Sequence, residues 1–247
     1  MEKLIRNALL QHMISEELLS DYQHGFVMGR SCTTQLLQVI DKWTEILDEG
    51  GSVDVIYLDL TKAFDTVPHQ RLLNKLSGYG VGGRILEWIK QFLTGRRQKV
   101  RVGHAELAWS EVLSGVPLGS VLGPVLCVCY INDLPDIISS FLYMYADDTM
   151  LFRRVDKGED RKRLQCDLDL VGDWAGKWQL RFNVDKCKTM HLGGSFQETR
   201  VSYEMKCPNG QSPHTIEETK EEKVLISNNL KSSAHIAAAV NKANKIL

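Results

Sequence analysis

The stretch FLYMYADDTMLF, residues 141–152, decides the fold, because it sets Asp147 and Asp148 inside an otherwise apolar and aromatic strand pattern. A second stretch, SVDVIYLDL at residues 52–60, is typical of a strand buried on both faces and carries Asp59 near its end. Neither stretch contains a lysine or arginine. Burying an ionised carboxylate costs several kcal/mol unless a positive group neutralises it. These three acids therefore need an explanation.

Divalent cations with oxygen ligands are one solution, since Mg²⁺ is usually held by one or two carboxylates together with phosphates. A tight turn at Asp147 and Asp148 would let them approach Asp59. Three carboxylates at one point suggest two metals roughly 4 Å apart, the arrangement that serves phosphoryl transfer. The alternative is structural: Asp59 ends a strand and the other two acids form a hairpin tip. Spacing alone leaves both open.

The segments around these stretches alternate between helix and strand patterns. In residues 35–48 an apolar face recurs at helical spacing, with Thr33 and Thr34 placed to cap its start; the face consists of Leu36, Ile40, Trp43 and Leu47. The remaining patterns predict a basic strand edge over 95–103, a helix over 159–182, loops or a weak hairpin over 195–225, and a helix over 234–247. The fold class is therefore α+β.

Composition excludes several classes of protein. The 247 residues are 43% hydrophobic and 25% charged, which is typical of a globular chain and not of a disordered one. A formal net charge of -1 excludes a strongly basic molecule, so nucleic-acid binding would need local patches. Six cysteines without a CxxC pair favour neither a zinc site nor a disulfide framework.

Two apolar segments bear on localisation. The start, MEKLIRNALLQHM, lacks the continuous apolar stretch of a signal peptide, so we expect a protein of the nucleus or cytoplasm that is not secreted. Residues 112–132 are uncharged, but Pro117 and Pro124 would interrupt a spanning helix. We expect a loop leading into a buried helix, and no membrane partner.

Six stretches, taken in order, resemble the polymerase core of reverse transcriptases. They are QHGFVMGRSC (23–32), YLDLTKAFDTVPH (57–69), SGVPLGSVLGP (114–124), YINDLP (130–135), YADD (145–148) and KWQLRFNVDKCKTMHLG (177–193). Their residues are most similar to those of non-LTR (LINE-type) retrotransposons of the chicken-repeat-1 and jockey-like groups. The resemblance implies a right-hand polymerase fold with an antiparallel palm sheet packed on helices. It divides the chain into partial fingers (1–52), palm (53–194) and a truncated thumb or connector (195–247).

The resemblance also implies an activity, RNA-directed DNA synthesis by two-metal nucleotidyl transfer. Its cofactor would be two Mg²⁺ ions, with Mn²⁺ as a possible substitute. Its partners would be an RNA template, a DNA primer and deoxynucleoside triphosphates. By the same resemblance, Asp59, Asp147 and Asp148 match the catalytic, metal-binding aspartates, and the backbone carbonyl of Leu60 joins the first of them.

Further positions match the family's substrate contacts, each with a plainer structural alternative. Phe64 matches the residue that crowds the sugar 2′-position, and would otherwise be a core phenylalanine. Arg30 matches a triphosphate-gripping arginine, and Lys186 the acid that protonates the pyrophosphate, with Lys188 as second choice; both would otherwise be surface residues. Gly193 falls in the primer-gripping turn, or in a simple glycine turn. The basic strand with Arg96, Arg97, Lys99 and Arg101 could contact phosphates of the template or primer, or form a solvated face.

The chain departs from the family at several places. Leu118 stands beside Gly119 where relatives have a glutamine that lies against the template and nascent base pair, and Leu118 cannot make its hydrogen bonds. Val27 and Met28 replace basic residues on the triphosphate side. With the short thumb and no endonuclease, these departures suggest a truncated element copy. Two alternatives to an active polymerase stay open: a catalytically impaired nucleic-acid-binding remnant, and the inert product of a relic reading frame.

Overall fold

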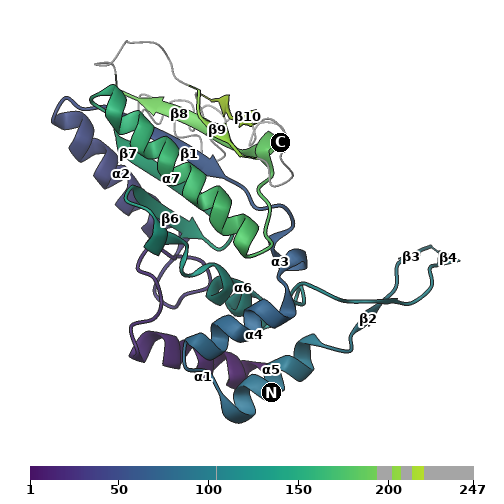
Figure 1. Ribbon diagram of the computed structural model, residues 1–247. Coiled ribbons are helices and arrows are strands. Elements are labelled where there is room, and N and C mark those ends of the chain that lie inside the picture. The colour runs from purple at the N-terminus through teal and green to yellow at the C-terminus, as the bar shows by residue number, and fades with distance from the viewer. Residues whose placement is uncertain (104, 194–201, 207–212, 220–247) are drawn as a thin grey trace, which may run out of the picture.

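The computed structural model describes residues 1–103, 105–193, 202–206 and 213–219 (Figure 1). The helix predicted over 234–247 lies outside these residues. The centre of the fold is a five-stranded sheet in the order β11-β8-β1-β7-β6. Its strands are β1 (Val53–Leu58), β6 (Phe141–Tyr145), β7 (Asp148–Arg154), β8 (Lys188–Leu192) and β11 (Glu217–Glu218). All pairs are antiparallel except β11 with β8.

The central strand β1 is buried on both faces, as its β-branched sequence predicts. Val53 and Val55 pack into one apolar cluster with α2 (Cys32–Asp48), whereas Ile56 and Leu58 pack into another with α7 (Gly158–Lys177). Helices therefore cover both faces of the sheet, and α7 runs across the face turned to the viewer in Figure 1. The predicted α+β class, with a largely antiparallel sheet on helices, is confirmed.

Helix α2 differs from its prediction in its start and in its buried face. Ser31, rather than Thr33 or Thr34, is the N-cap: its hydroxyl accepts a hydrogen bond from the Thr34 amide at 3.1 Å. The buried residues are Gln35, Val39, Trp43 and Ile46, so only Trp43 of the predicted face is among them. The helix is rotated about its axis relative to the prediction, because the Trp43 ring packs edge-on against Phe152 of β7. This contact brings the residues four before and three after Trp43, Val39 and Ile46, onto the sheet.

Helix α7 ends earlier than predicted, at Lys177 rather than residue 182. Gln179 adopts a left-handed conformation with φ 58°, which a helix cannot continue through. The amide of Leu180 then donates to the carbonyl of Ala175 at 2.8 Å and closes the helix end.

A second group of helices packs below the sheet in Figure 1. It contains α1 (Glu2–Ser15), α4 (His69–Gly78), α5 (Gly83–Leu93) and α6 (Gly123–Ile131). Every residue of α6 but Pro124 is buried, which confirms that the uncharged run leads into a buried core helix. Within the described residues, no helix is both long and apolar enough to cross a membrane.

The remaining elements are short. The predicted basic strand edge is part of a ribbon that projects from the body in Figure 1, formed by β2 (Arg97–Gln98) with β5 (Ser110–Glu111) and β3 (Arg101–Val102) with β4 (Ala105–Glu106). β9 (Glu204–Met205) pairs antiparallel with β10 (His214–Thr215), so the described part of 195–225 contains a weak hairpin. The others are α3 (Ala63–Thr66) and the 3₁₀ helices η1 (Leu134–Ile137) and η2 (Val184–Lys186).

Candidate active site

The two adjacent acids lie at the tip of the β6–β7 hairpin. Tyr145 pairs with Asp148, which leaves Ala146 and Asp147 as a two-residue turn. Ala146 has φ 55°, a left-handed conformation that a hairpin turn of this length normally assigns to glycine. Asp147 is half-buried, and Asp148 is exposed at the start of β7. The hairpin-tip alternative is therefore correct as a description of the local structure, and it is compatible with a site.

The third acid lies along the same edge of the sheet, the one at which β1 ends and the β6–β7 hairpin turns. Asp59 follows β1 directly, and the last pair between β1 and β7 joins Leu58 to Thr149. Antiparallel pairing therefore sets the end of β1 beside the hairpin turn. The carbonyl of Asp59 accepts a hydrogen bond from the Asn183 amide at 2.8 Å, and Leu60 forms a bridge with Phe182. Segments far apart in sequence thus bring Asp59, Asp147 and Lys186 to one edge.

The electrostatics of this edge are those of crowded carboxylates. Burial raises the pKa of Asp147, and the negative charges of Asp148 and Asp59 raise it further. The opposing charge comes from Lys186, whose Nζ lies 3.5 Å from Asp59 Oδ1. Because the Lys186 side chain is 61% exposed, water screens much of this attraction. Additional positive charge at this edge would therefore stabilise the ionised acids.

The donor atoms at this edge suit a hard cation, since Mg²⁺ prefers carboxylate and carbonyl oxygens. The three acids do not form a closed metal cage: across the described ranges, no group of three His, Cys, Asp or Glu side chains is arranged to hold a metal ion. The residues fit a divalent cation in their chemistry and charge.

Phe64 and the 115–119 loop lie next to this edge. Phe64, in α3, is half-buried and its ring meets that of Phe26 edge-on at 6.5 Å. The carbonyl of Phe64 accepts a hydrogen bond from the Val116 amide at 2.6 Å, which ties the loop to α3. Leu118 is 68% exposed, and Gly119 has φ 80°. The chain therefore presents an apolar side chain to solvent where the family glutamine is expected.

Arg30 is engaged with the chain itself. Its guanidinium donates to the carbonyls of Ser20 at 2.7 Å and Gln23 at 2.8 Å, and pairs with Asp21 at 2.9 Å. These bonds fasten the loop that precedes α2. The predicted contact with a triphosphate stays a prediction, and the loop role is one that sequence reasoning missed.

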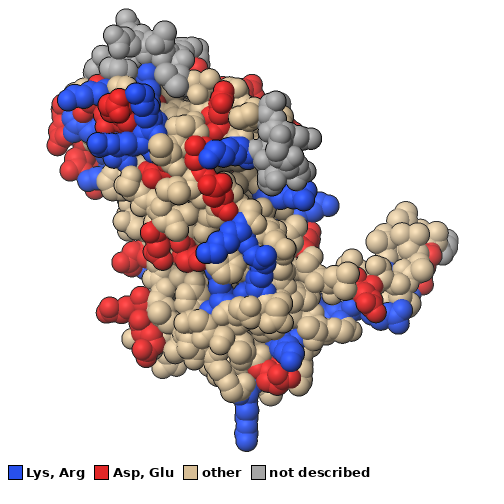
Figure 2. Space-filling view, viewed as in Figure 1, with Lys and Arg blue, Asp and Glu red and all other residues tan. Residues whose placement is uncertain are grey.

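The other predicted residues lie away from the acids. Gly193, with φ 92°, follows β8 and sits beside Gly51, at the start of β1 rather than its end. The four basic residues, Arg96, Arg97, Lys99 and Arg101, lie at the base and along the projecting ribbon. Figure 2 shows blue and red atoms together on this ribbon, and both Lys99 and Arg101 pair with Glu106. Arg96 lies over the Phe92 ring and Lys99 over Trp109.

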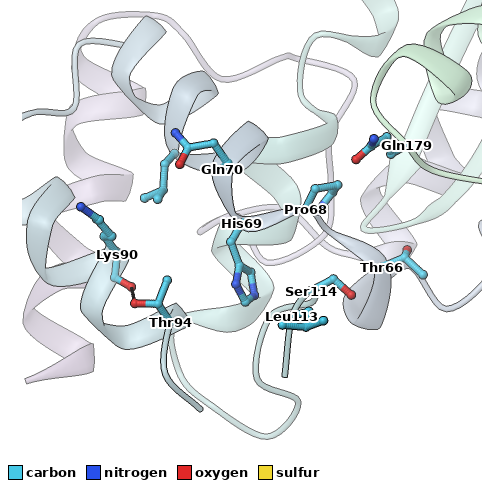
Figure 3. A pocket seen from close by; sticks show the side chains of 10 residues that line it. Thr66, Pro68, His69, Gln70, Lys90, Thr94, Leu113, Ser114 and Gln179 are labelled. Carbon is cyan, nitrogen blue, oxygen red and sulfur yellow. Dashed lines mark hydrogen bonds between the residues drawn. The ribbon is translucent and has the colours of Figure 1, made fainter. Parts of the chain in front are cut away.

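A cavity of about 600 Å³ lies between α4, α5 and residues 113–114, and the three acids are not among its lining residues. Figure 3 shows His69 between Lys90 and Thr94 on one side and Leu113 and Ser114 on the other. His69 Nε2 lies 2.8 Å from the carbonyl of Gly115, so the histidine bonds to the loop that leads to Leu118. No sequence pattern predicts this cavity, because its lining residues come from four separate segments.

The fold is that of a right-hand polymerase, a largely antiparallel sheet packed on helices. Solved structures share this fold: telomerase from Candida tropicalis in complex with the TWJ fragment of telomeric RNA aligns with a TM-score of 0.61 at 11% identity, over 92% of this chain and 37% of that one. Telomerase from Candida albicans with the same kind of fragment gives 0.60 at 13% identity, over 81% and 35%. At such identities the likeness establishes the fold alone.

The family follows from sequence. Residues 1–226 match the family described as reverse transcriptase (RNA-dependent DNA polymerase), and the chain belongs to it. The probable RNA-directed DNA polymerase from transposon BS of Drosophila melanogaster is 31% identical over 75% of this chain. The polymerase from mobile element jockey of Drosophila funebris is 28% identical over 80%. These relatives confirm the jockey-like resemblance. The chain spans about a fifth of their length, 21% and 22%.

Proposed function

We propose that this chain is the catalytic core of a retrotransposon's RNA-directed DNA polymerase, joining deoxynucleotides to a DNA primer along an RNA template. The observation that carries the proposal is the meeting of Asp59 with the Asp147 turn at one edge of the sheet, where burial and mutual repulsion raise the pKa of Asp147. A family member that keeps crowded acids at this edge has the negative charge that a cation-dependent reaction needs.

Asp59, Asp147, Asp148 and the carbonyl of Leu60 would hold two Mg²⁺ ions, or Mn²⁺ in their place. The bridge between Leu60 and Phe182 uses the carbonyl of Asp59 and the amide of Thr61, not the Leu60 carbonyl. When bound, the cations would lower the pKa of the primer 3′-hydroxyl and stabilise charge on the triphosphate. Lys186, the cation next to Asp59, would donate a proton to the departing pyrophosphate.

The substrates would lie across the surface between this edge and the ribbon. Phe64 would crowd the sugar 2′-position, while Leu118 and Gly119 would face the template. Arg96, Arg97, Lys99 and Arg101 would contact phosphates. Gly193 lies at the other end of the sheet, so it would contact the primer only away from the acids. Because Lys99 and Arg101 are paired with Glu106, we expect this ribbon to add only modestly to the salt dependence of binding.

Primer extension on an RNA template with Mg²⁺ and deoxynucleotides tests the proposal, with Asp147→Asn as the inactive control. Extension by the wild-type chain that is absent in Asp147→Asn supports the proposed function. The exposed Leu118 favours a second candidate, a nucleic-acid-binding remnant with impaired catalysis. Folded protein that binds RNA in a salt-sensitive way but gives no extension, even as Leu118→Gln, would establish that candidate instead. A broad, non-cooperative melt would point to the inert relic.

A further inference from the structure

Residues 22–24 pair with the outer side of β6 through an isolated bridge. The carbonyl of Tyr22 accepts a hydrogen bond from the Met144 amide, and the His24 amide donates to the Met144 carbonyl, both at 2.8 Å. Gln23 and Met144 form a parallel bridge. Because β6 is an outermost strand of the sheet, this segment covers the side of β6 that no other strand of the sheet pairs with, and it runs on toward the hairpin turn.

Gln23 binds that turn with both ends of its side-chain amide. Its Oε1 accepts a hydrogen bond from the Ala146 amide at 2.9 Å, and its Nε2 donates to the Ala146 carbonyl at 3.3 Å. The same Oε1 accepts from the Gly25 amide at 2.7 Å. Gln23 is fully buried, with 0% of its surface exposed, so these bonds form away from competing water.

The residue held in this way is the strained one. Ala146 has φ 55°, a region that residues with a side chain rarely occupy, and it directly precedes Asp147. A neighbouring structure must therefore hold it there. The Arg30 guanidinium donates a hydrogen bond to the backbone carbonyl of Gln23 at 2.8 Å, so the backbone that carries the Gln23 side chain is itself held in place.

We propose that Gln23 is a positioning residue, whose side-chain amide keeps Ala146 in the left-handed conformation and thereby fixes where Asp147 points. The inference rests on the proposed function, because it gives Asp147 its role. A glutamine that only fills the core would make a different prediction. Glycine adopts the left-handed conformation without help. If positioning is the role of Gln23, Ala146→Gly reduces the need for it.

The experiment is a double-mutant cycle of Gln23→Ala and Ala146→Gly, with Gln35→Ala as the matched control, since Gln35 is a buried glutamine of α2. Gln23→Ala lowers kcat about 10- to 100-fold, the loss typical of a misplacement near 1 Å. Ala146→Gly stays near wild type, and the double variant recovers at least tenfold over Gln23→Ala. Gln35→Ala lowers Tm but leaves kcat unchanged. Full activity of Gln23→Ala, or no recovery in the double variant, overturns the proposal.

One further readout does not depend on polymerase activity, and one further variant tests the two hydrogen bonds of the Gln23 side chain separately. Amide hydrogen exchange at Ala146 accelerates at least tenfold in Gln23→Ala relative to the Met144 amide, which keeps its own acceptor. Gln23→Glu keeps the Oε1 acceptor but replaces the Nε2 donor, so its kcat falls between wild type and Gln23→Ala. Unchanged exchange at Ala146 refutes positioning even if the wild-type chain does not polymerise; accelerated exchange in an inactive chain refutes only the proposed function.

Discussion

Replacing Gly25 by alanine tests how tightly the segment before α2 fits against the Ala146–Asp147 turn of the β6–β7 hairpin. A Cβ at this position would lie 2.2 Å from the Ala146 nitrogen, 2.9 Å from its Cα and 3.0 Å from the Tyr145 carbonyl carbon. All three atoms belong to the backbone, so no flexible side chain can move aside. Gly25 itself is not in the left-handed region, so the substitution introduces a clash without adding backbone strain.

The size of the effect follows from these distances. Ordinary contact begins at 3.4 Å, so the turn and the Gly25 segment must separate by about 1.2 Å. Overpacking of this kind costs about 1–3 kcal/mol of unfolding free energy. A displacement near 1 Å at a reacting group lowers the rate about 10²-fold. We therefore expect Gly25→Ala to stay folded with a lower Tm and to lose about 99% of its extension rate.

The measurement is primer extension beside a thermal melt, with Gly172→Ala as control. Gly172 lies within α7, and a Cβ there would meet nothing within 4 Å. Alanine in a helix interior stabilises by about 0.5–1 kcal/mol relative to glycine, so this control gains Tm and keeps its rate. Wild-type rate and Tm in Gly25→Ala would refute the packing argument. A lower Tm with an unchanged rate would refute the link between packing and Asp147.

Three further predictions concern charged groups. Asp147→Asn removes one of the crowded carboxylates, so extension disappears while calorimetry shows up to about 1 kcal/mol of added stability; a lower Tm contradicts this. Lys186→Ala slows single-turnover extension about 10²-fold, whereas Lys188→Ala, which loses only a pair with Glu217, changes it less than about twofold; equal losses refute the assignment. Lys75 lies buried over the Trp178 ring and against Asp133, and burial lowers its pKa to about 8. Between pH 8 and 10.5 the unfolded chain therefore binds more protons at Lys75 than the folded chain does, so the free energy of unfolding of the wild type, relative to that of Lys75→Met, rises with pH. Urea denaturation measures this difference, and a difference that does not change with pH would falsify the lowered pKa.

Local pattern was enough to predict most elements. The β-branched run 52–60 became β1, the aromatic run 141–152 became the β6–β7 hairpin, and the helix over 159–182 formed with an earlier end. The prediction of β1 succeeds because burial on both faces requires apolar residues at successive positions. The helix prediction succeeds because a helix with one buried face repeats its apolar residues every three or four positions. The face of α2 was wrong because several apolar stripes were available, and only contact with Phe152 selects one of them.

The candidate site could be predicted in its acids but not in its supports. Asp59, Asp147 and Asp148 stand out because charges are rare in apolar strands. Gln23 begins one of the six family stretches, but nothing local shows what its side chain binds until the fold brings it against Ala146, 123 residues away. Arg30 likewise looked free to bind a ligand, and only the fold shows its guanidinium engaged by two carbonyls and Asp21.

By itself, the sequence determined the α+β class and the family, and it marked the three acids as candidates, because each of these depends on residue types within short stretches. Tertiary structure alone decided that β1 and β7 pair with Leu58 opposite Thr149, which sets Asp59 beside the hairpin turn and Gly193 at the other end of the sheet. It also decided which side chains hold the turn. Pairing register and buried hydrogen bonds depend on groups that come into contact only when distant segments pack, so no short stretch of sequence predicts them.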